Sequence, residues 1–292
     1  MASGRRRLSP VWLGTIPFFV YALLFLFLPA GEVLVGAFKA AHGGWTVGNV
    51  RDLVRQPYIG AYETSIKISL ATALVGALLG LGIAYAAIRD GTPRWFRGIL
   101  TTFSGVAANF GGIPLAFAFI ASVGNVGIVT KFLVQHLHWN IYSTNYPIFG
   151  HFTLFGTFGV GVVYMYFQIP LMILVVAPAL DGLRREWREA ASNLGASSWQ
   201  FWRHVGAPVL APSFLGAVIL LFGNAFAAYA TAYSLTAGSV NLVPIQIGYY
   251  YSGNVLDNPH LAQALAFGMF VVLAVMMAIY IPLQRRAARW AR

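Results

Sequence analysis

Charged residues are scarce in this sequence, and cysteine is absent. Lys, Arg, Asp and Glu together make up 9% of the 292 residues, whereas soluble domains usually contain about 25%. Without cysteine the chain can form neither disulfides nor thiolate metal sites, and it has no cysteine nucleophile. Hydrophobic residues make up 58% of the chain, more than a soluble fold of this length could bury, because its surface must meet water. The composition therefore predicts a protein embedded in lipid.

Sequence patterns that carry chemistry are missing as well. The phosphate-binding pattern GxxxxGK[ST] does not occur, and His136 and His138 would need a third ligand to hold a metal ion. An enzyme acting inside the membrane would need a Ser/His or paired-Asp arrangement, which His151 and the scattered serines do not supply. We predict no catalytic residue, no metal site and no cofactor on this chain, which is therefore not expected to be an enzyme.

What the sequence does contain is a series of long apolar runs without charge. A helix needs roughly 20 apolar residues to cross the hydrocarbon of a bilayer. The first run, Val11–Gly31, is longer than the apolar region of about 7–15 residues in a secretory leader, so we expect it to be retained as a span. We predict six transmembrane helices, near residues 11–38, 62–88, 98–122, 152–179, 210–235 and 262–284. In the second, Gly76 and Gly80 have the spacing that lets two helices approach closely in lipid.

The basic residues report how the chain is threaded through the membrane. Fourteen of the 19 Lys and Arg residues fall within residues 5–7, 89–97, 184–203 and 285–292. These clusters share one side of the six predicted spans, as the positive-inside rule requires of the cytoplasmic side. We therefore expect a multi-pass protein of the cytoplasmic (inner) cell membrane with both termini cytoplasmic. The net charge of +11 is explained by this topology and does not indicate nucleic-acid binding.

One outer loop has a pattern of its own. Within residues 123–150, the apolar residues recur at helical spacing, while Lys131, Gln135 and His138 occupy another face. This pattern predicts a short helix lying at the membrane surface. Such a helix would close the outer end of the bundle or provide a docking surface for an extracytoplasmic partner.

The cytoplasmic loop 181–208 contains more structure than a simple connector needs. Residues from Glu186 to Leu194 favour a helix, and Gly195 supplies the left-handed conformation that ends one. Ser197 and Gln200 form a capping-box pair that begins a second short helix, which we expect Pro208 to end. The sequence therefore predicts a helix–turn–helix elbow on which another protein docks.

The same loop contains Glu189-Ala190-Ala191, then Gly195, and further on the stretch from Val205 to Pro208. In residues and spacing this pattern resembles the EAA loop of binding-protein-dependent permeases of the ATP-binding-cassette (ABC) type. Val205 stands where the family has Ile, and Ala207 stands where it has Leu, which removes apolar bulk beside the proline. The likeness extends over roughly residues 60–285 and is strongest over residues 180–225.

The resemblance implies a fold, a division of the chain and a set of partners. The fold would be an all-α membrane protein with six transmembrane helices, in the type I ABC importer permease architecture with a cytoplasmic coupling helix. The parts would be a cytoplasmic tail (1–10), a first helix with an extracytoplasmic segment (11–61), a core permease domain (62–284) and a basic tail (285–292). Expected partners are ABC ATPase subunits that bind ATP and Mg²⁺, a second identical or homologous permease, and an extracytoplasmic solute-binding protein.

The solute is less well determined by the sequence. The segment from Val106 to Phe119 resembles permeases of the spermidine/putrescine branch, which implies a polyamine-type solute; a sugar or glycerol-phosphate importer is the alternative. Polar residues inside spans are costly and often functional, so Asn109, Gln168, Asn224 and Tyr229 are candidates for lining the pathway. Each could instead hydrogen-bond a neighbouring helix.

Two other classes of membrane protein remain as rivals. Half of a secondary transporter would be expected to carry carboxylates within its spans and to lack a docking elbow. A channel subunit would need a filter loop or a ring of charges, and neither is visible in this sequence.

Overall fold

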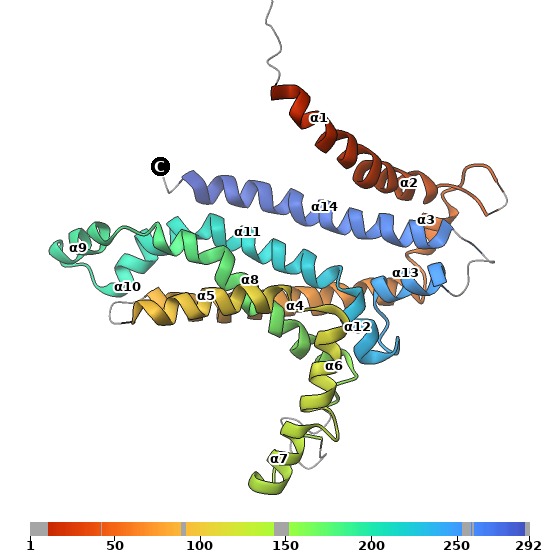
Figure 1. Cartoon of the computed structure of the whole chain (residues 1–292). Helices are drawn as coiled ribbons and strands as arrows, with labels where there is room; N and C mark the ends of the chain where they lie inside the picture. The colour runs from red at the N-terminus through yellow and green to blue at the C-terminus, as the bar shows by residue number, and fades with distance from the viewer. Residues whose placement is uncertain are drawn as a thin grey trace, which may run out of the picture. The chain divides into compact units, whose positions relative to one another are not determined.

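The structure is a computed structural model of the chain, and it describes residues 11–41, 43–88, 92–142, 152–252, 258 and 260–289. The predicted tail at 1–10, His151 and the last three residues lie outside this part. The helices, drawn in Figure 1, are α1 (Val11–Ala22), α2 (Leu28–Gly36), α3 (Gly48–Asp52), α4 (Tyr58–Ile88), α5 (Arg94–Asn109), α6 (Gly112–Val123), α7 (Ile128–Leu137), α8 (Thr157–Asp181), α9 (Arg185–Asn193), α10 (Ser198–Phe201), α11 (Ala207–Phe226), α12 (Tyr229–Thr236), α13 (Val243–Ser252) and α14 (His260–Arg289). Two π-helical turns, Leu23–Phe27 and Trp202–Gly206, join α1 to α2 and α10 to α11.

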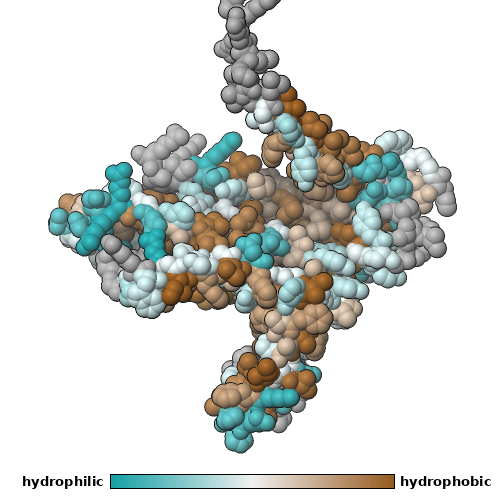
Figure 2. Space-filling model, viewed as in Figure 1, coloured by the Kyte–Doolittle hydropathy of each residue, from teal (hydrophilic) through white to brown (hydrophobic). Residues whose placement is uncertain are grey.

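Within the described residues, six helical stretches are long and apolar enough to cross a membrane, which confirms the predicted number and the all-α membrane fold. They are Gly14–Gly36, Tyr58–Ala87, Gly112–Leu137, Thr157–Asp181, Ser198–Phe226 and His260–Arg286. Many large apolar side chains on these helices are exposed, and Figure 2 shows hydrophobic colour along much of their visible surface. Lipid is the solvent in which such a surface is stable.

The described chain separates into two compact units. The first comprises the described residues of 11–58 and 247–270 and is held by polar contacts outside the apolar helices. Asn49 is buried, and its amide nitrogen donates hydrogen bonds to the carbonyls of Ala37 (3.2 Å) and Lys39 (2.8 Å). The amide of Asn258 donates to Asn49 Oδ1 at 2.9 Å. This network fixes the segment that follows the first span to the residues that precede α14.

The second unit comprises the described residues of 59–246 and 271–289, and its core gathers around α8, where residues of α4, α6, α11 and α12 pack. A Cβ atom added at Gly76 would lie 2.9 Å from Gln168 Cβ, and one added at Gly80 would lie 2.6 Å from Met172 Cβ. No side chain fits in either gap, so α4 and α8 approach each other almost backbone to backbone. This confirms the close helix packing that the glycine spacing predicts.

The third predicted span, 98–122, is wrong as a single helix. Helix α5 ends at Asn109, and α6 begins at Gly112 after two residues that are not helical. Gly112 has φ +68°, a left-handed conformation that glycine adopts without steric cost. Figure 1 shows α6 leaving α5 at a steep angle. The candidate span in this region instead joins α6 to α7.

The fifth predicted span, 210–235, is also interrupted. Helix α11 ends at Phe226 and α12 begins at Tyr229, with Ala227 and Ala228 between them. The interruption packs beside the first one, because α6 packs against α12. The backbone N–H of Gly112 donates to Thr231 Oγ1 at 2.8 Å, and the Tyr164 hydroxyl donates to the Ala228 carbonyl at 2.8 Å. These bonds satisfy backbone groups that a helix break would leave unpaired in lipid.

The predicted helix within 123–150 is present as α7. Its C-cap residue, His138, is left-handed with φ 50°. Residues 143–150 lie outside the described part of the chain. Beyond α7, the Tyr142 hydroxyl donates to the Val123 carbonyl at 2.6 Å, and burial raises the pKa of that hydroxyl. The loop is thereby fixed back onto the end of α6.

Candidate functional site

The elbow formed by α9 and the turn after it is built as the sequence predicts. Gly195 has φ +76°, and its N–H donates to the Ser192 carbonyl at 2.9 Å. The next N–H, of Ala196, reaches back to the Ala191 carbonyl at 2.9 Å. This pair of bonds is a Schellman motif, in which one left-handed residue satisfies the last carbonyls of a helix. Gly195 therefore ends α9 in a defined and rigid way.

The second half of the elbow begins as predicted but does not end as predicted. Gln200 N–H donates to Ser197 Oγ at 3.3 Å, and Ser197 N–H donates to Gln200 Oε1 at 2.7 Å, which confirms the capping box. We expected Pro208 to end this short helix, and that is wrong. The helix continues from Ser198 to Phe226 as one 29-residue stretch.

A π-helical turn explains how the chain passes Pro208. Proline has no N–H and so leaves the i−4 carbonyl without a helical partner. Over Trp202–Gly206 the chain widens, and Ala207 N–H donates to the Trp202 carbonyl, five residues back. Such turns absorb a local mismatch without ending the helix. The elbow is thus continuous with the fifth span.

The residues of the predicted coupling motif lie on or near a surface that this chain does not cover. Glu189, Ala190 and Gly195 are exposed, and Ala191, Val205 and Pro208 are half-buried. Glu189 Oε1 is 3.2 Å from Arg185 Nε, one turn earlier on α9. Figure 2 shows hydrophilic side chains gathered at this end of the unit. No residue of α9 is buried, so the helix lacks the apolar contacts that normally stabilise one.

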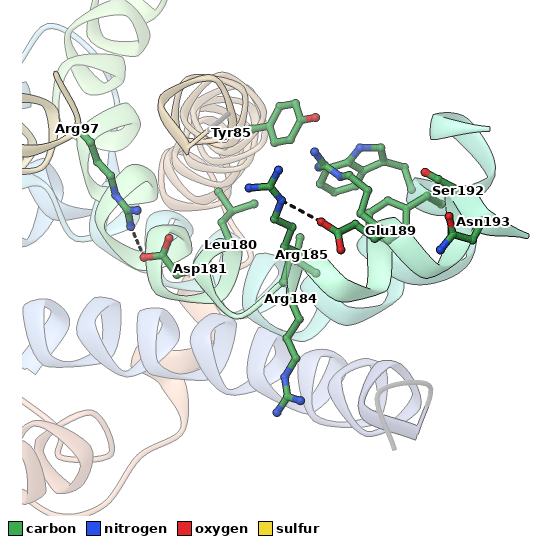
Figure 3. A pocket seen from close by; sticks show the side chains of 13 residues that line it. Tyr85, Arg97, Leu180, Asp181, Arg184, Arg185, Glu189, Ser192 and Asn193 are labelled. Atoms are coloured by element: carbon green, nitrogen blue, oxygen red, sulfur yellow. Dashed lines mark hydrogen bonds and ion pairs between the residues drawn. The ribbon is translucent and has the colours of Figure 1, made fainter. Parts of the chain in front are cut away.

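A cleft of about 450 Å³ separates α9 from the ends of the spans. Figure 3 shows charged side chains from α5, α8 and α9 around it. Arg97 at the start of α5 forms an ion pair with Asp181 at the end of α8. The Arg188 guanidinium lies 5.6 Å from the ring centre of Phe201, a cation–π distance. The ion pair joins α5 to α8, and the cation–π contact joins α9 to the start of the fifth span.

The four candidate pathway residues are placed in two different environments. Asn109 and Asn224 are exposed, and Tyr229 is 37% exposed and stacks on Tyr233 at 5.4 Å. Asn109 ends α5 and Tyr229 begins α12, so both adjoin the paired helix breaks. Gln168 is fully buried, and its amide donates to Thr72 Oγ1 at 2.8 Å. Gln168 therefore forms a hydrogen bond to a neighbouring helix, which is the alternative to lining the pathway. Its role in the pathway stays a prediction.

Three features of the site were not anticipated from the sequence. Leu194, which caps α9, is 87% exposed and presents an apolar knob at the tip of the elbow. The Arg97–Asp181 ion pair joins residues 84 positions apart, and no local pattern could have revealed it. The break at 110–111 had a signal in the pair Gly111-Gly112, but the break at 227–228 lies among alanines that favour a helix. In the described parts of the chain, no three His, Asp or Glu side chains gather as a metal site would require.

Comparison with known proteins agrees with this architecture. The chain is 24% identical over 277 residues to a "Spermidine/putrescine transport system permease protein PotC homolog" of Mycoplasma pneumoniae, covering 90% of this chain and 86% of the relative. It is 28% identical over 244 residues to a "Sulfate transport system permease protein CysT" of Synechocystis, covering 83% and 74%. Further relatives are also named as sulfate permeases.

A solved structure shares the fold. A bacterial alginate ABC transporter, solved in complex with an alginate pentasaccharide-bound periplasmic protein, matches with a TM-score of 0.69 at 17% identity. The match covers 94% of this chain and 94% of that one.

The family model "Binding-protein-dependent transport system inner membrane component" matches residues 11–290. Its members are transport permeases and not enzymes, in agreement with the prediction for this chain. The secondary-transporter and channel hypotheses are thereby set aside. This multi-pass membrane protein belongs to the binding-protein-dependent transport system inner membrane components, the permease subunits of ABC importers.

Proposed function

We propose that the α9 elbow receives a partner ATPase subunit and transmits its movement to the transmembrane helices. The observation that carries this proposal is the continuity of the elbow with the fifth span, from Ser198 to Phe226. A docking surface on a flexible loop would lose a partner's displacement in the loop. A surface joined to a spanning helix passes the displacement on.

The exposed residues of the elbow suit a protein partner. Leu194 offers an apolar knob, Ala190 leaves room for close approach, and Glu189 offers a carboxylate to a basic or amide group. Exposed apolar side chains grouped with charges are typical of a docking surface. In this proposal the ATPase subunits bind ATP and Mg²⁺, and their approach to each other drives the spans between inward- and outward-open states.

Two substitutions test the coupling role. Glu189→Lys reverses the charge at the predicted contact, and Gly195→Asp disturbs the turn that positions it. We expect both to lower transport-coupled ATP hydrolysis in the reconstituted transporter. Glu186→Lys is the matched control, because Glu186 is exposed on the same helix but lies outside the motif. Undiminished coupling in both motif variants would refute the assignment.

We further propose the topology and the assembly implied by the basic clusters and the family. Both termini and the elbow lie in the cytoplasm, and α7 lies on the opposite side with the solute-binding protein. Asn109, Asn224 and Tyr229 remain exposed in this chain, and a second permease, identical or homologous, would complete the pathway against them.

For the solute, a polyamine is the first candidate. It is supported by the resemblance of residues 106–119 and by the relative named as a spermidine/putrescine permease. The exposed Tyr229 and Tyr233 rings, stacked beside the helix break, offer π faces that attract organic cations.

Sulfate is the second candidate, and different observations favour it. Several relatives are named as sulfate permeases. Helices α5, α6, α11 and α12 contain no Asp or Glu, so nothing acidic adjoins the paired breaks within these helices. Both α6 and α12 begin at the breaks, and helix N-termini favour anions.

The two candidates are separated by the cognate solute-binding protein. Its thermal unfolding should be measured with spermidine, putrescine, sulfate and a neutral sugar. A shift with a polyamine alone supports the first candidate, and a shift with sulfate alone supports the second. Stabilisation by the sugar alone would contradict both.

A further inference from the structure

An apolar groove and a basic cleft meet at the α9 end of the second unit. The groove has a volume of about 540 Å³ and is lined by apolar residues of α4, by Trp199 and by Leu210. The cleft of about 450 Å³ beside it is the one that α9 covers. Tyr85, Leu180 and Trp202 line both. The Tyr85 and Trp202 rings pack edge to face, with centres 5.0 Å apart.

The two hollows differ sharply in chemistry. Leu78 and Trp199 in the groove are 62% and 73% exposed, because no side chain of the described chain covers them. The cleft is lined by four arginines and two carboxylates, so that its net charge is positive. Aromatic pairs of this kind are enriched where a membrane protein passes from hydrocarbon to head groups.

Two of the four arginines that line the cleft are not paired with a carboxylate of the described residues. Arg97 is paired with Asp181, and Arg185 is paired with Glu189. Arg184 and Arg188 form no ion pair with any carboxylate of the described residues, and each lies near an aromatic ring. An Arg guanidinium binds phosphate through two parallel N–H donors and is weakly hydrated, which suits a site at the edge of a membrane.

We propose that these adjoining hollows bind one anionic phospholipid. Its phosphate lies in the cleft, where Arg188 supplies the positive charge. One acyl chain lies in the groove along Leu78, Leu81 and Trp199. The argument is charge complementarity: a ligand with an anionic head and an apolar tail matches a basic cleft that opens into an apolar groove, and basic pockets between spans are typical lipid sites. The bound lipid would hold the elbow against the spans.

The test uses the full chain in nanodiscs of phosphatidylcholine. Phosphatidylglycerol with brominated acyl chains is added in increasing mole fraction, and brominated phosphatidylcholine is the reference lipid. Bromine quenches nearby tryptophan fluorescence, and the contribution of Trp199 is the difference between the wild type and Trp199→Phe. We expect this contribution to be quenched at a lower mole fraction of phosphatidylglycerol than of phosphatidylcholine.

Charge and groove variants locate the site. Arg188→Gln should raise the half-quenching fraction of phosphatidylglycerol about fivefold, the effect of one arginine near a membrane surface. Its matched control is Arg203→Gln, an exposed arginine on the same segment that lines neither hollow. Gly82→Leu should fill the groove, because a Cβ at Gly82 meets open space. Gly98→Leu adds the same side chain at an equally open position outside the groove.

Several outcomes would overturn the proposal. One is equal quenching by the two lipids, and another is an equal loss in the Arg188 and Arg203 variants, which would show a general surface-charge effect. If Arg188→Gln lowered ATPase coupling but left lipid preference unchanged, the arginine would belong to the protein-docking surface instead. Near-UV circular dichroism checks that each variant folds. If Arg188→Gln misfolds, Arg188→Lys replaces it. This variant keeps the charge but loses the two parallel N–H donors of the guanidinium, and it should give an intermediate shift in the half-quenching fraction.

Discussion

Replacing Gly195 with larger residues is expected to weaken the elbow through backbone strain alone. Gly195 has φ +76°, and a Cβ atom built there meets nothing within 4 Å. A substitution therefore introduces no clash within the chain, and its cost is that of placing an L-residue in the left-handed region. That cost is about 1–2 kcal/mol, or a factor of about 5–30 in the population of the closed turn.

A graded series separates strain from side-chain size. Asn visits the left-handed region several-fold more readily than other residues, whereas a β-branched residue is a genuine outlier there. We therefore expect the turn to weaken in the order Gly195→Asn, Gly195→Ala, Gly195→Val. Gly98→Ala is the control, since Gly98 lies in a helix with equal open space and an ordinary φ.

Hydrogen exchange measures the effect without any partner protein. The N–H groups of Leu194, Gly195 and Ala196 donate to carbonyls at 2.9–3.1 Å and should exchange slowly. In full-length chain in nanodiscs, exchange of the peptide containing these amides should rise about 5- to 30-fold in Gly195→Val. Unchanged exchange in that variant would refute the reasoning. If coupling fell equally in the Asn and Val variants, Gly195 would matter for close approach of a partner instead of for its φ.

Three further predictions concern packing, the helix breaks and the topology. Gly80→Leu should destabilise the chain by about 3 kcal/mol or more, because its Cβ would lie 2.6 Å from Met172 Cβ and 2.8 Å from the Ile169 carbonyl. Thermal unfolding measures this loss of stability, and an equal loss in Gly82→Leu would contradict the prediction. Thr231→Val should cost about 1 kcal/mol by leaving the Gly112 N–H unpaired, and Thr231→Ser should restore stability if the hydroxyl is responsible. Because the chain has no cysteine, a single introduced cysteine reports on which side of the membrane it lies. Ser192→Cys should react with an impermeant maleimide only in inside-out vesicles, and Thr46→Cys only in right-side-out cells. The reverse pattern would overturn the proposed orientation.

Local sequence signals predicted the features that depend on local backbone chemistry. The end of α9 at Gly195 and the capping box of Ser197 and Gln200 each involve residues within one turn, and both are confirmed. The prediction that Pro208 ends the short helix is wrong, because it too considers only local backbone chemistry. The missing N–H of Pro208 favours a helix end, but a π-helical turn and the following apolar span offset that preference.

The helix breaks could not be predicted because distant residues determine them. Ala227 and Ala228 favour a helix. The chain nevertheless leaves the helix there, because the Tyr164 hydroxyl donates a hydrogen bond to the Ala228 carbonyl. The bond from Gly112 to Thr231 spans 119 positions in the sequence. In lipid an unpaired backbone group costs several kcal/mol, so a break is stable only where such tertiary partners exist. The sequence alone contains no record of that proximity.

The fifth span connects the two parts of the proposed mechanism. It begins in the elbow at Ser198 and ends at Phe226, beside the paired breaks. At 1.5 Å per residue, a helix of 29 residues is roughly 44 Å long, so a tilt imposed at one end produces a displacement at the other. At the break the Tyr164 hydroxyl donates to the Ala228 carbonyl, and the Gly112 N–H donates to Thr231 Oγ1. Because the helix is interrupted between Phe226 and Tyr229, a tilt of the span should be absorbed there, where Asn109 and Tyr229 are exposed.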